Sequence, residues 1–443
     1  MARRIIVVGG GAAGMGVAGA AQGTDPGAEI TVFTDFEDAA YSPCGIPYVH
    51  GKEIASFETL FMATKQQYVD QGIDIRYETR VAGLDPKAHT VTTSDGKTER
   101  YDSLVLATGF TYADPGVPGG DLGGLYYVKN IRRAMEWDKV LDGVRAAVVD
   151  ECTPLGAEMV TALAHRGIET HLVDPAPWGM SMATDPDIME PVQQSWEEMG
   201  VKLHFNTKVT SFNGTNGQVS SVSTSGGDIT ADLVVPATDK EPNTALAVAA
   251  GVKTGMSGGI IVDGRMRTSL PDVYAAGDCT EIPHGVSNVP IQGLSGSHAY
   301  SQGKVAGVGA AGGIREYNPV FVPWGMVAGK WMIGGVSFSE TLATALGMEF
   351  VVGLAQGISR ARYYPDVKQV LVKLLVEPKG GRLIGAQMVG GEGIKERADF
   401  LAMVVRTGIT VQELATMENV YSPPIGALNE PIALAAQNAL TQL

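Results

Sequence analysis

The chain has 443 residues, 44% of them hydrophobic and 18% charged, which is an ordinary composition for a globular protein of several domains. Its formal net charge of −15 argues against nucleic acid or an anionic membrane as a partner, because the protein's field repels phosphates. No apolar run reaches the roughly 18 residues that span a bilayer. The start of the chain enters a strand without a signal-peptide pattern, so we predict a cytoplasmic protein.

Residues 4–35 predict a strand, a glycine turn, a helix and a second strand. The apolar run Ile5–Val8 is typical of a buried parallel strand, and a GxGxxG pattern follows it directly. In this context Gly9 would make a tight turn, Gly11 would let the backbone approach a pyrophosphate, and Gly14 would let the helix lie close to the strand. The pattern therefore indicates a dinucleotide site.

The cysteine in Tyr41-Ser-Pro-Cys-Gly-Ile-Pro-Tyr48 lies just beyond the second of these strands. A thiol placed there lies near the ring that the dinucleotide carries, so Cys44 is a candidate for electron exchange with a flavin. A buried structural cysteine is the alternative. Cys152 and Cys279 form no CxxC pair or zinc pattern with it, and we expect them to have packing roles in a reducing compartment. We predict no metal site.

Later segments repeat and complete this pattern. Residues 102–109 predict a second buried strand that ends in a glycine turn. Residues 144–174 repeat the strand–helix–strand unit, which indicates a second nucleotide domain inserted into the first. Residues 260–278 end in Gly-Asp, and we expect Asp278 to reach the ribitol chain of a flavin. Beyond residue 320, short apolar runs predict an antiparallel sheet, and two helices follow at 394–407 and 411–417, as in an interface domain.

The order of these motifs resembles the pyridine nucleotide-disulfide oxidoreductase superfamily, above all its single-cysteine branch of coenzyme A-disulfide reductases, NADH oxidases and polysulfide reductases. The resemblance covers essentially the whole chain. It is carried by the glycine fingerprint, Ser42–Tyr48, Ala107–Gly109, Tyr274–Asp278 and Tyr421–Pro424. It implies an α/β fold of two nested Rossmann-like, three-layer dinucleotide-binding domains, as in glutathione reductase, with an α+β C-terminal dimerisation domain.

The resemblance also implies domain boundaries and site residues. The FAD domain would comprise residues 1–112 and 250–320, the NAD(P)H-binding-like domain 113–249, and the dimerisation domain 321–443. Cys44 would lie beside the isoalloxazine and cycle between thiolate and mixed disulfide, persulfide or sulfenic acid. The expected FAD-binding residues are Gly9, Gly11, Ala12, Ala13, Gly14, Thr34, Asp35, Pro43, Val81, Ala107, Thr108, Gly109, Gly277 and Asp278.

Two C-terminal tyrosines of the partner subunit approach the cysteine in coenzyme A-disulfide reductases. Tyr421 matches one of them, and either Tyr363 or Tyr364 matches the other. A phenol can hydrogen-bond a departing thiolate, so these are catalytic candidates. Aromatic packing at a subunit interface is the alternative.

The second nucleotide unit departs from the family at its fingerprint, which reads Glu-Cys-Thr-Pro-Leu-Gly over residues 151–156. Glu151 places a carboxylate where a glycine should turn, and Thr153 places a β-branched side chain where a pyrophosphate should approach. Asp174 remains at the place of a ribose-binding acid. We therefore expect that NAD(P)H binding is doubtful and that another donor serves, such as a small thiol, ferredoxin or a reduced deazaflavin.

The helix after the first fingerprint ends without a basic residue in Gly19–Asp25, where coenzyme A-using relatives carry several. This disfavours coenzyme A as the substrate. Arg360 and Arg362 could instead bind a small carboxylate or sulfonate, or could be solvated surface residues.

The sequence thus predicts a homodimeric FAD-dependent oxidoreductase that acts on a small thiol, disulfide or persulfide through Cys44, with NAD(P)H doubtful as its electron donor. The alternatives are an NAD(P)H-dependent coenzyme A-disulfide or polysulfide reductase or NADH oxidase, a flavin-cysteine lyase without net redox change, and a sensor that uses the flavin structurally.

Overall fold

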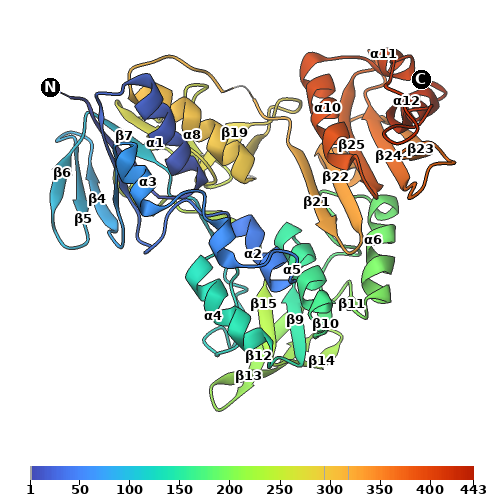
Figure 1. Ribbon diagram of the computed structural model, residues 1–443, viewed down its shortest axis with the longest axis horizontal. Coiled ribbons are helices and arrows are strands. Elements are labelled where there is room, and N and C mark those ends of the chain that lie inside the picture. Colours follow the sequence, from blue (N-terminus) through green and yellow to red (C-terminus); the bar gives the residue numbers. More distant parts are fainter. Residues whose placement is uncertain (1, 294, 318) are drawn as a thin grey trace. The chain divides into compact units, whose positions relative to one another are not determined.

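The computed structural model describes residues 2–293, 295–317 and 319–443 (Figure 1). The chain forms two compact units. Unit 1 comprises Met1–Ile46, Ser56–Ala113 and Asp239–Val320, and unit 2 comprises Pro47–Ala55, Asp114–Thr238 and Phe321–Leu443. The division into three domains, with its predicted boundaries, stays a prediction.

Unit 1 is built on a five-stranded parallel sheet. Its strands lie in the order β18 (Val273–Ala275), β7 (Ser103–Leu106), β1 (Arg4–Val8), β2 (Glu29–Phe33), β3 (Ile73–Arg76). The apolar runs of β1 and β7 occupy the middle of the sheet and are buried. Strands covered on both faces carry continuous apolar runs rather than alternating ones, which is why these were recognisable in the sequence.

Two helices lie side by side in unit 1, α1 (Ala12–Thr24) and α8 (Gly296–Ala310) (Figure 1). Their backbones approach closely because α8 presents glycines to α1. A Cβ at Gly303 would lie 2.2 Å from the Ala13 carbonyl oxygen, and a Cβ at Gly307 would lie 2.3 Å from that of Val17. Small residues are thus a steric requirement of this helix pair.

The rest of unit 1 surrounds this sheet and helix pair with short elements. An antiparallel sheet contains β4 (Val81–Asp85), β5 (Thr90–Thr93) and β6 (Thr98–Arg100). In a mixed sheet, β19 (Thr280–Pro283) pairs in parallel with β17 (Ile260–Ile261) and antiparallel with β20 (Pro290–Gln292). Strands β8 (Phe110–Tyr112) and β16 (Lys240–Pro242) pair as an antiparallel ribbon. The short helices are η1 (Pro43–Gly45), η2 (Phe57–Leu60), α3 (Lys65–Asp70) and α7 (Ala245–Ala249). Helix α2 (Ile46–His50) continues from η1, and its residues after Ile46 belong to unit 2.

The first half of unit 2 repeats the strand–helix–strand design, as the sequence predicted. A parallel sheet has the order β11 (Lys202–His204), β10 (Glu169–Val173), β9 (Ala146–Asp150), β15 (Leu233–Pro236). The meander β12 (Val209–Thr215), β13 (Gln218–Thr224), β14 (Gly227–Thr230) contributes buried Phe212 and Val222 to one core with Val148. The helices here are α4 (Ile131–Leu141), α5 (Pro154–His165) and α6 (Pro186–Glu198).

The C-terminal half of unit 2 contains the predicted antiparallel sheet. Its order is β21 (Pro323–Ala328), β22 (Trp331–Ser337), β25 (Leu383–Gly390), β24 (Gln369–Val376), β23 (Val351–Ile358). Both predicted helices form, as α10 (Ile394–Thr407) and α11 (Val411–Ala415). Helices α9 (Glu340–Ala345) and α12 (Pro431–Leu440), which were not predicted, complete this half.

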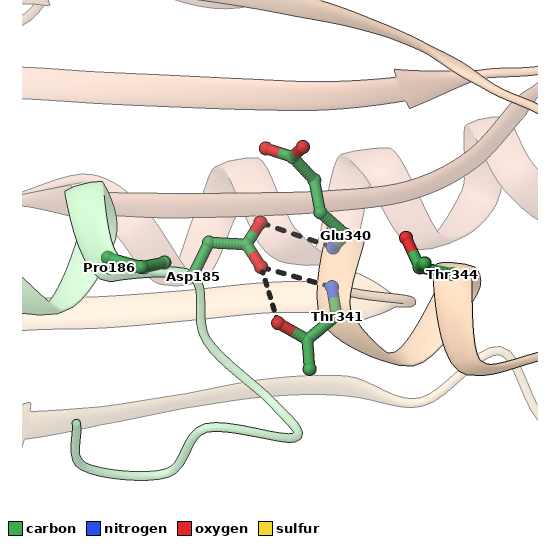
Figure 2. A pocket seen from close by; sticks show the side chains of 5 residues that line it. All are labelled: Asp185, Pro186, Glu340, Thr341 and Thr344. Carbon is green, nitrogen blue, oxygen red and sulfur yellow. Dashed lines mark hydrogen bonds between the residues drawn. The ribbon is translucent and has the colours of Figure 1, made fainter. Parts of the chain in front are cut away.

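A buried ionic network joins the two halves of unit 2. The Lys373 ammonium of β24 lies 3.3 Å from the Asp185 carboxylate and 2.7 Å from that of Asp187, and it also contacts Glu340. Asp185 in turn accepts hydrogen bonds from the backbone N–H groups of Glu340 and Thr341 at 3.2 and 3.4 Å (Figure 2). Burial opposes the charge of Lys373, but its carboxylate partners outweigh burial and raise its pKa. Lys373 and Asp185, the two buried charges of this network, therefore each have a partner.

We predict that Gly307→Ala weakens unit 1, because the new methyl group would overlap the Val17 carbonyl oxygen at 2.3 Å. Overpacking of this kind costs about 1–3 kcal/mol of unfolding free energy. Gly19→Ala in α1 is the matched control, since a Cβ there meets no atom within 4 Å. It should stabilise the protein by about 0.5–1 kcal/mol through the helix preference of alanine. Urea unfolding of both variants measures this, and equal effects would contradict the close contact of α1 with α8.

Candidate active site

The glycine turn between β1 and α1 has the geometry that an anion-binding turn requires. Gly9 adopts φ +118°, and a Cβ there would lie 2.1 Å from the Ala107 carbonyl oxygen. A Cβ at Gly14 would lie 1.8 Å from the Gly9 carbonyl oxygen. Gly11, the N-cap of α1, has open space beside it and offers no side-chain cap. The first N–H groups of α1, from Ala12 onward, therefore face a space that suits a pyrophosphate.

Three further residues of the expected FAD site, Thr34, Asp35 and Val81, lie directly after β2 and at the start of β4. Thr34 is buried, and its hydroxyl oxygen accepts a hydrogen bond from the Phe36 N–H at 3.3 Å. A Cβ at Gly10 would lie 3.1 Å from the Cβ of Thr34, so this residue lies against the glycine turn. Asp35 is exposed, whereas Val81 is buried.

Asp278 is brought to the same turn from far away in the sequence. Gly277 adopts φ +86°, and a Cβ there would lie 2.8 Å from the Ala13 Cβ. The Oδ1 atom of Asp278 is buried and has no hydrogen-bond partner within the part of the chain that the structure describes. A buried acceptor without a donor is costly unless a ligand supplies the donor, as a ribitol hydroxyl would. The turn and this carboxylate thus fit the two ends of a flavin dinucleotide's linker.

The Ala107–Gly109 segment, at the end of β7, lies against the same glycine turn. The Thr108 hydroxyl donates to the Asn243 carbonyl oxygen at 2.6 Å, and the Asn243 side-chain amide donates to the Thr108 carbonyl oxygen at 3.0 Å. Gly109 adopts φ +67°, a left-handed conformation that favours glycine. The two hydrogen bonds hold the end of β7 where it meets Gly9.

Cys44 is exposed on η1, directly after Pro43. The segment before it is hydrogen-bonded to the glycine turn, because the Ala40 N–H donates to the Gly10 carbonyl oxygen at 2.9 Å. A Cβ at Gly45 would lie 2.2 Å from the Leu60 side chain, so η1 also lies against η2. The thiol is therefore presented by a fixed turn next to the dinucleotide fingerprint.

The other two cysteines have different surroundings. Cys152 and Cys279 are both fully enclosed, and burial raises the pKa of each thiol. The reactive form of cysteine is the thiolate, so both are poor nucleophiles. Among the three cysteines, only Cys44 is accessible to a substrate.

His50 is a feature that the sequence analysis missed. It lies at the end of α2, in the part of that helix that belongs to unit 2, and is fully buried. Its ring nitrogens contact the Asp138 carboxylate at 3.2 Å and the Tyr126 hydroxyl at 2.9 Å. Burial lowers its pKa. The Arg166 guanidinium also donates to the His50 carbonyl oxygen at 3.3 Å. Polar contacts thus hold His50 in place, six residues after Cys44. In the sequence, only the histidine itself could have pointed to these contacts.

The C-terminal tyrosines separate into two environments. The hydroxyls of Tyr363 and Tyr421 lie 3.0 Å apart, and both side chains are exposed. This hydrogen bond raises the pKa of Tyr421. Tyr364 instead lies near Arg360, with the guanidinium carbon 5.8 Å from the ring centroid. The structure therefore groups Tyr363, rather than Tyr364, with Tyr421.

The two arginines considered for substrate binding also differ. Arg360 pairs with Glu392 through Nε at 2.9 Å, and that pairing raises the pKa of the guanidinium. A guanidinium with its own carboxylate weighs against Arg360 as an anion site. Arg362 is exposed and forms no ion pair with the described residues.

The turn of the second nucleotide unit keeps its backbone geometry without its glycines. Glu151 adopts φ +72°, the left-handed conformation that glycine would supply, and a Cβ at Gly156 would lie 2.1 Å from the Glu151 carbonyl oxygen. The Thr153 hydroxyl caps α5 by accepting from the Gly156 N–H at 3.3 Å. Asp174 accepts from the Cys152 N–H at 2.7 Å. The strand–turn–helix arrangement therefore survives the substitutions.

The family comparisons agree with this geometry. Residues 3–299 match the family described as pyridine nucleotide-disulphide oxidoreductase, and residues 325–431 match its dimerisation domain. The chain belongs to the pyridine nucleotide-disulphide oxidoreductase family. It is a flavin-dependent enzyme of the disulfide oxidoreductase type, and the predicted fold class is confirmed.

Individual relatives match the single-cysteine branch. The NADH oxidase of Methanocaldococcus jannaschii is 34% identical over 447 residues, covering 99% of each chain. The NAD(P)H sulfur oxidoreductase (CoA-dependent) of Pyrococcus abyssi is 28% identical and covers 98% of each chain. The structure of an NAD-dependent persulfide reductase from A. fulgidus has a TM-score of 0.96 and 29% identity, covering 99% of this chain and 83% of that one.

These relatives correct the expectation that NAD(P)H binding is doubtful. Proteins with this fold that are similar along the whole chain are named as NADH- or NAD(P)H-dependent enzymes. The expectation was wrong because it judged the turn by the side chains of Glu151 and Thr153, whereas the structure shows that the backbone turn is retained. The lyase alternative also finds no support, since the named relatives are oxidases and reductases.

The part of the chain that the structure describes holds no helix long and apolar enough to cross a membrane. In the same residues, no group of three or more His, Cys, Asp or Glu side chains is placed to hold a metal ion. The absence of a metal cofactor and the cytoplasmic location stay predictions.

We predict a pH-dependent stability that arises at Asp150, at the end of β9. Burial, with the nearby charges of Glu151 and Asp174, raises the pKa of Asp150 to about 7. In the unfolded chain an aspartate titrates at about pH 4. Between these values the folded state holds a proton that the unfolded state has lost, so the unfolding free energy falls as the pH rises from about 4 to 7.

Asp150→Asn removes this group's contribution and should be more stable than the wild type at pH 8. The difference should shrink toward pH 5, because the wild-type carboxyl is then protonated. Urea unfolding at the two pH values measures it, with Asp121→Asn as a control at an exposed site. A difference between wild type and Asp150→Asn that does not vary with pH would contradict the raised pKa.

Proposed function

We propose that the protein is an NAD(P)H-dependent FAD enzyme that reduces a small persulfide, polysulfide or disulfide through Cys44. The observation that carries the proposal is the exposed Cys44 turn, whose preceding segment is hydrogen-bonded to the dinucleotide fingerprint at Gly10. The names of the similar sulfur and persulfide reductases support the substrate class.

The chain's own residues account for the sulfur chemistry. The Cys44 thiolate attacks one sulfur of the substrate, the sulfur–sulfur bond breaks, and the leaving thiolate takes up a proton. The product is a mixed disulfide, persulfide or polysulfide on Cys44. FAD, when bound, supplies the two electrons that NAD(P)H provides. These electrons and a proton release the second thiol or sulfide and restore the Cys44 thiolate.

The FAD site that we propose uses the residues grouped around the first turn. The α1 N-terminus would take the pyrophosphate, and Asp278 Oδ1 would accept a hydrogen bond from a ribitol hydroxyl. The predicted contacts are retained as proposals: Gly9, Gly11, Ala12, Ala13, Gly14, Thr34, Asp35, Pro43, Val81, Ala107, Thr108, Gly109, Gly277 and Asp278.

We propose a homodimer in which the Tyr363–Tyr421 pair serves the cysteine of the partner subunit. The match of residues 325–431 to the dimerisation domain supports the dimer. The shared hydrogen bond at 3.0 Å would let the pair donate a proton to the leaving thiolate and replenish it from the neighbouring hydroxyl.

The substrate that we favour is small rather than a coenzyme A derivative. The last turn of α1 contains no basic residue that could pair with nucleotide phosphates. Arg362 could bind a small anion. An NADH oxidase is the second candidate, supported by the relative that is 34% identical along the whole chain. In that reaction Cys44 would cycle through a sulfenic acid.

We predict that Cys44→Ser abolishes reduction of inorganic polysulfide but leaves flavin reduction by NADH intact. Anaerobic titration with NADH should bleach the flavin of both proteins. Only the wild type should develop the long-wavelength absorption of a thiolate beside a flavin. A Cys44→Ser enzyme that reduces polysulfide at the wild-type rate would contradict the proposed role of Cys44. Parallel assays with coenzyme A disulfide and with oxygen separate the substrate candidates.

We predict that Tyr421→Phe and Tyr363→Phe each lower the turnover number by about 100-fold, the lower end of the range for proton transfer by a positioned side chain. Tyr364→Phe is the matched control, since its ring lies near Arg360 and not near Tyr421. It should leave the rate unchanged. Steady-state kinetics over pH 6–9 measure this, and equal losses in all three variants would indicate interface packing instead.

A further inference from the structure

Lys240, on the ribbon formed by β8 and β16, contacts Asp278 in the proposed flavin site. Its ammonium lies 3.3 Å from Oδ2 of Asp278. It also lies 4.4 Å from the centroid of the Phe110 ring, on the paired strand. The lysine is thus held between an aromatic face and a carboxylate.

The two oxygens of the Asp278 carboxylate therefore have different surroundings. Oδ2 receives the charge-assisted contact from Lys240, whereas Oδ1 is buried and unpartnered among the described residues. A carboxylate that is held through one oxygen cannot turn freely. Its other oxygen, Oδ1, then points in a narrower range of directions.

The backbone on both sides of this contact is fixed. Lys240 lies opposite Tyr112 in the ribbon, and its carbonyl oxygen accepts from the Gln292 side chain at 3.0 Å. A Cβ at Gly293 would lie 2.4 Å from the Cα of Asp278, so the chain after β20 lies against the aspartate. The geometry of the Lys240–Asp278 pair is therefore set by three segments that meet here.

We propose that Lys240 is a positioning residue for the flavin: it holds Oδ2 of Asp278 and aims Oδ1 at a hydroxyl of the bound FAD. It also balances the charge that the carboxylate places beside an anionic dinucleotide. The inference rests on the flavin site proposed above and adds a residue that acts through Asp278 rather than by touching the cofactor.

Reconstitution of the apoprotein with FAD, followed by flavin fluorescence, tests the role of Lys240. We expect Lys240→Met to weaken FAD binding about tenfold, as the loss of one partly exposed charge-assisted contact implies. Lys240→Arg should bind FAD nearly as the wild type does, because a guanidinium can also hold Oδ2. Lys253→Met is the matched control, since it removes an exposed lysine of unit 1 that forms no ion pair with described residues.

A double-mutant cycle separates positioning from a general structural role. In an Asp278→Asn background, Lys240→Met should weaken FAD binding no further, because the carboxylate that it positions is gone. If Lys240→Met costs as much in that background as in the wild type, or has no effect in either, the inference is overturned. Lys240→Gln serves as the second variant if Lys240→Met does not fold.

The same measurements distinguish failure of the inference from failure of the proposed function. A wild-type protein that binds no FAD would contradict the flavin site itself. A wild type that binds FAD tightly, with Lys240→Met binding equally well, would contradict only the role of Lys240. The flavin's midpoint potential in Lys240→Met and Lys240→Arg gives a second readout, which should shift in the first variant and not in the second.

Discussion

Backbone segments in unit 1 approach each other so closely that no side chain fits between them. The carbonyl oxygens of Gly9, Ala13 and Val17 occupy the positions that side chains would take at Gly14, Gly303 and Gly307. These contacts place the strand, the turn and both helices in one arrangement, and they leave the N-terminus of α1 uncovered. The proposed anion site thus follows from the close backbone packing, since the same glycines that permit the contact leave the first N–H groups of α1 accessible.

Burial, rather than sequence spacing, decides which thiol is chemically available. Cys279 is next to Asp278 in the sequence, yet it is enclosed and its pKa is raised. Cys44 lies on a short turn that is fastened at Ala40 and Gly45, and it remains exposed. A reactive cysteine needs both conditions, because an enclosed thiol does not ionise and a mobile one does not stay near its electron acceptor.

The second nucleotide unit retains the backbone conformation of the turn although the glycine pattern is absent from its sequence. A glycine pattern is a reliable positive sign, because glycine tolerates φ > 0 at little cost. Its loss is weaker evidence, since Glu151 adopts the same conformation within a well-packed turn. A glutamate in place of glycine at position 151 also adds a negative charge at the end of β9. This charge contributes to the raised pKa of the neighbouring Asp150. The relatives' use of NADH or NAD(P)H agrees with the retained backbone.

The sequence by itself determined the parallel strands, the glycine turn, the repeat of the nucleotide unit and the C-terminal antiparallel sheet, because buried runs and glycine positions are local signals. It also singled out Cys44 as the residue to examine. Only the tertiary structure showed the ion pairs Lys240–Asp278 and Arg360–Glu392 and the hydrogen bond between Tyr363 and Tyr421. Contacts between polar side chains far apart in the sequence depend on how the segments pack in three dimensions. The pattern of residues within one segment carries no information about that packing.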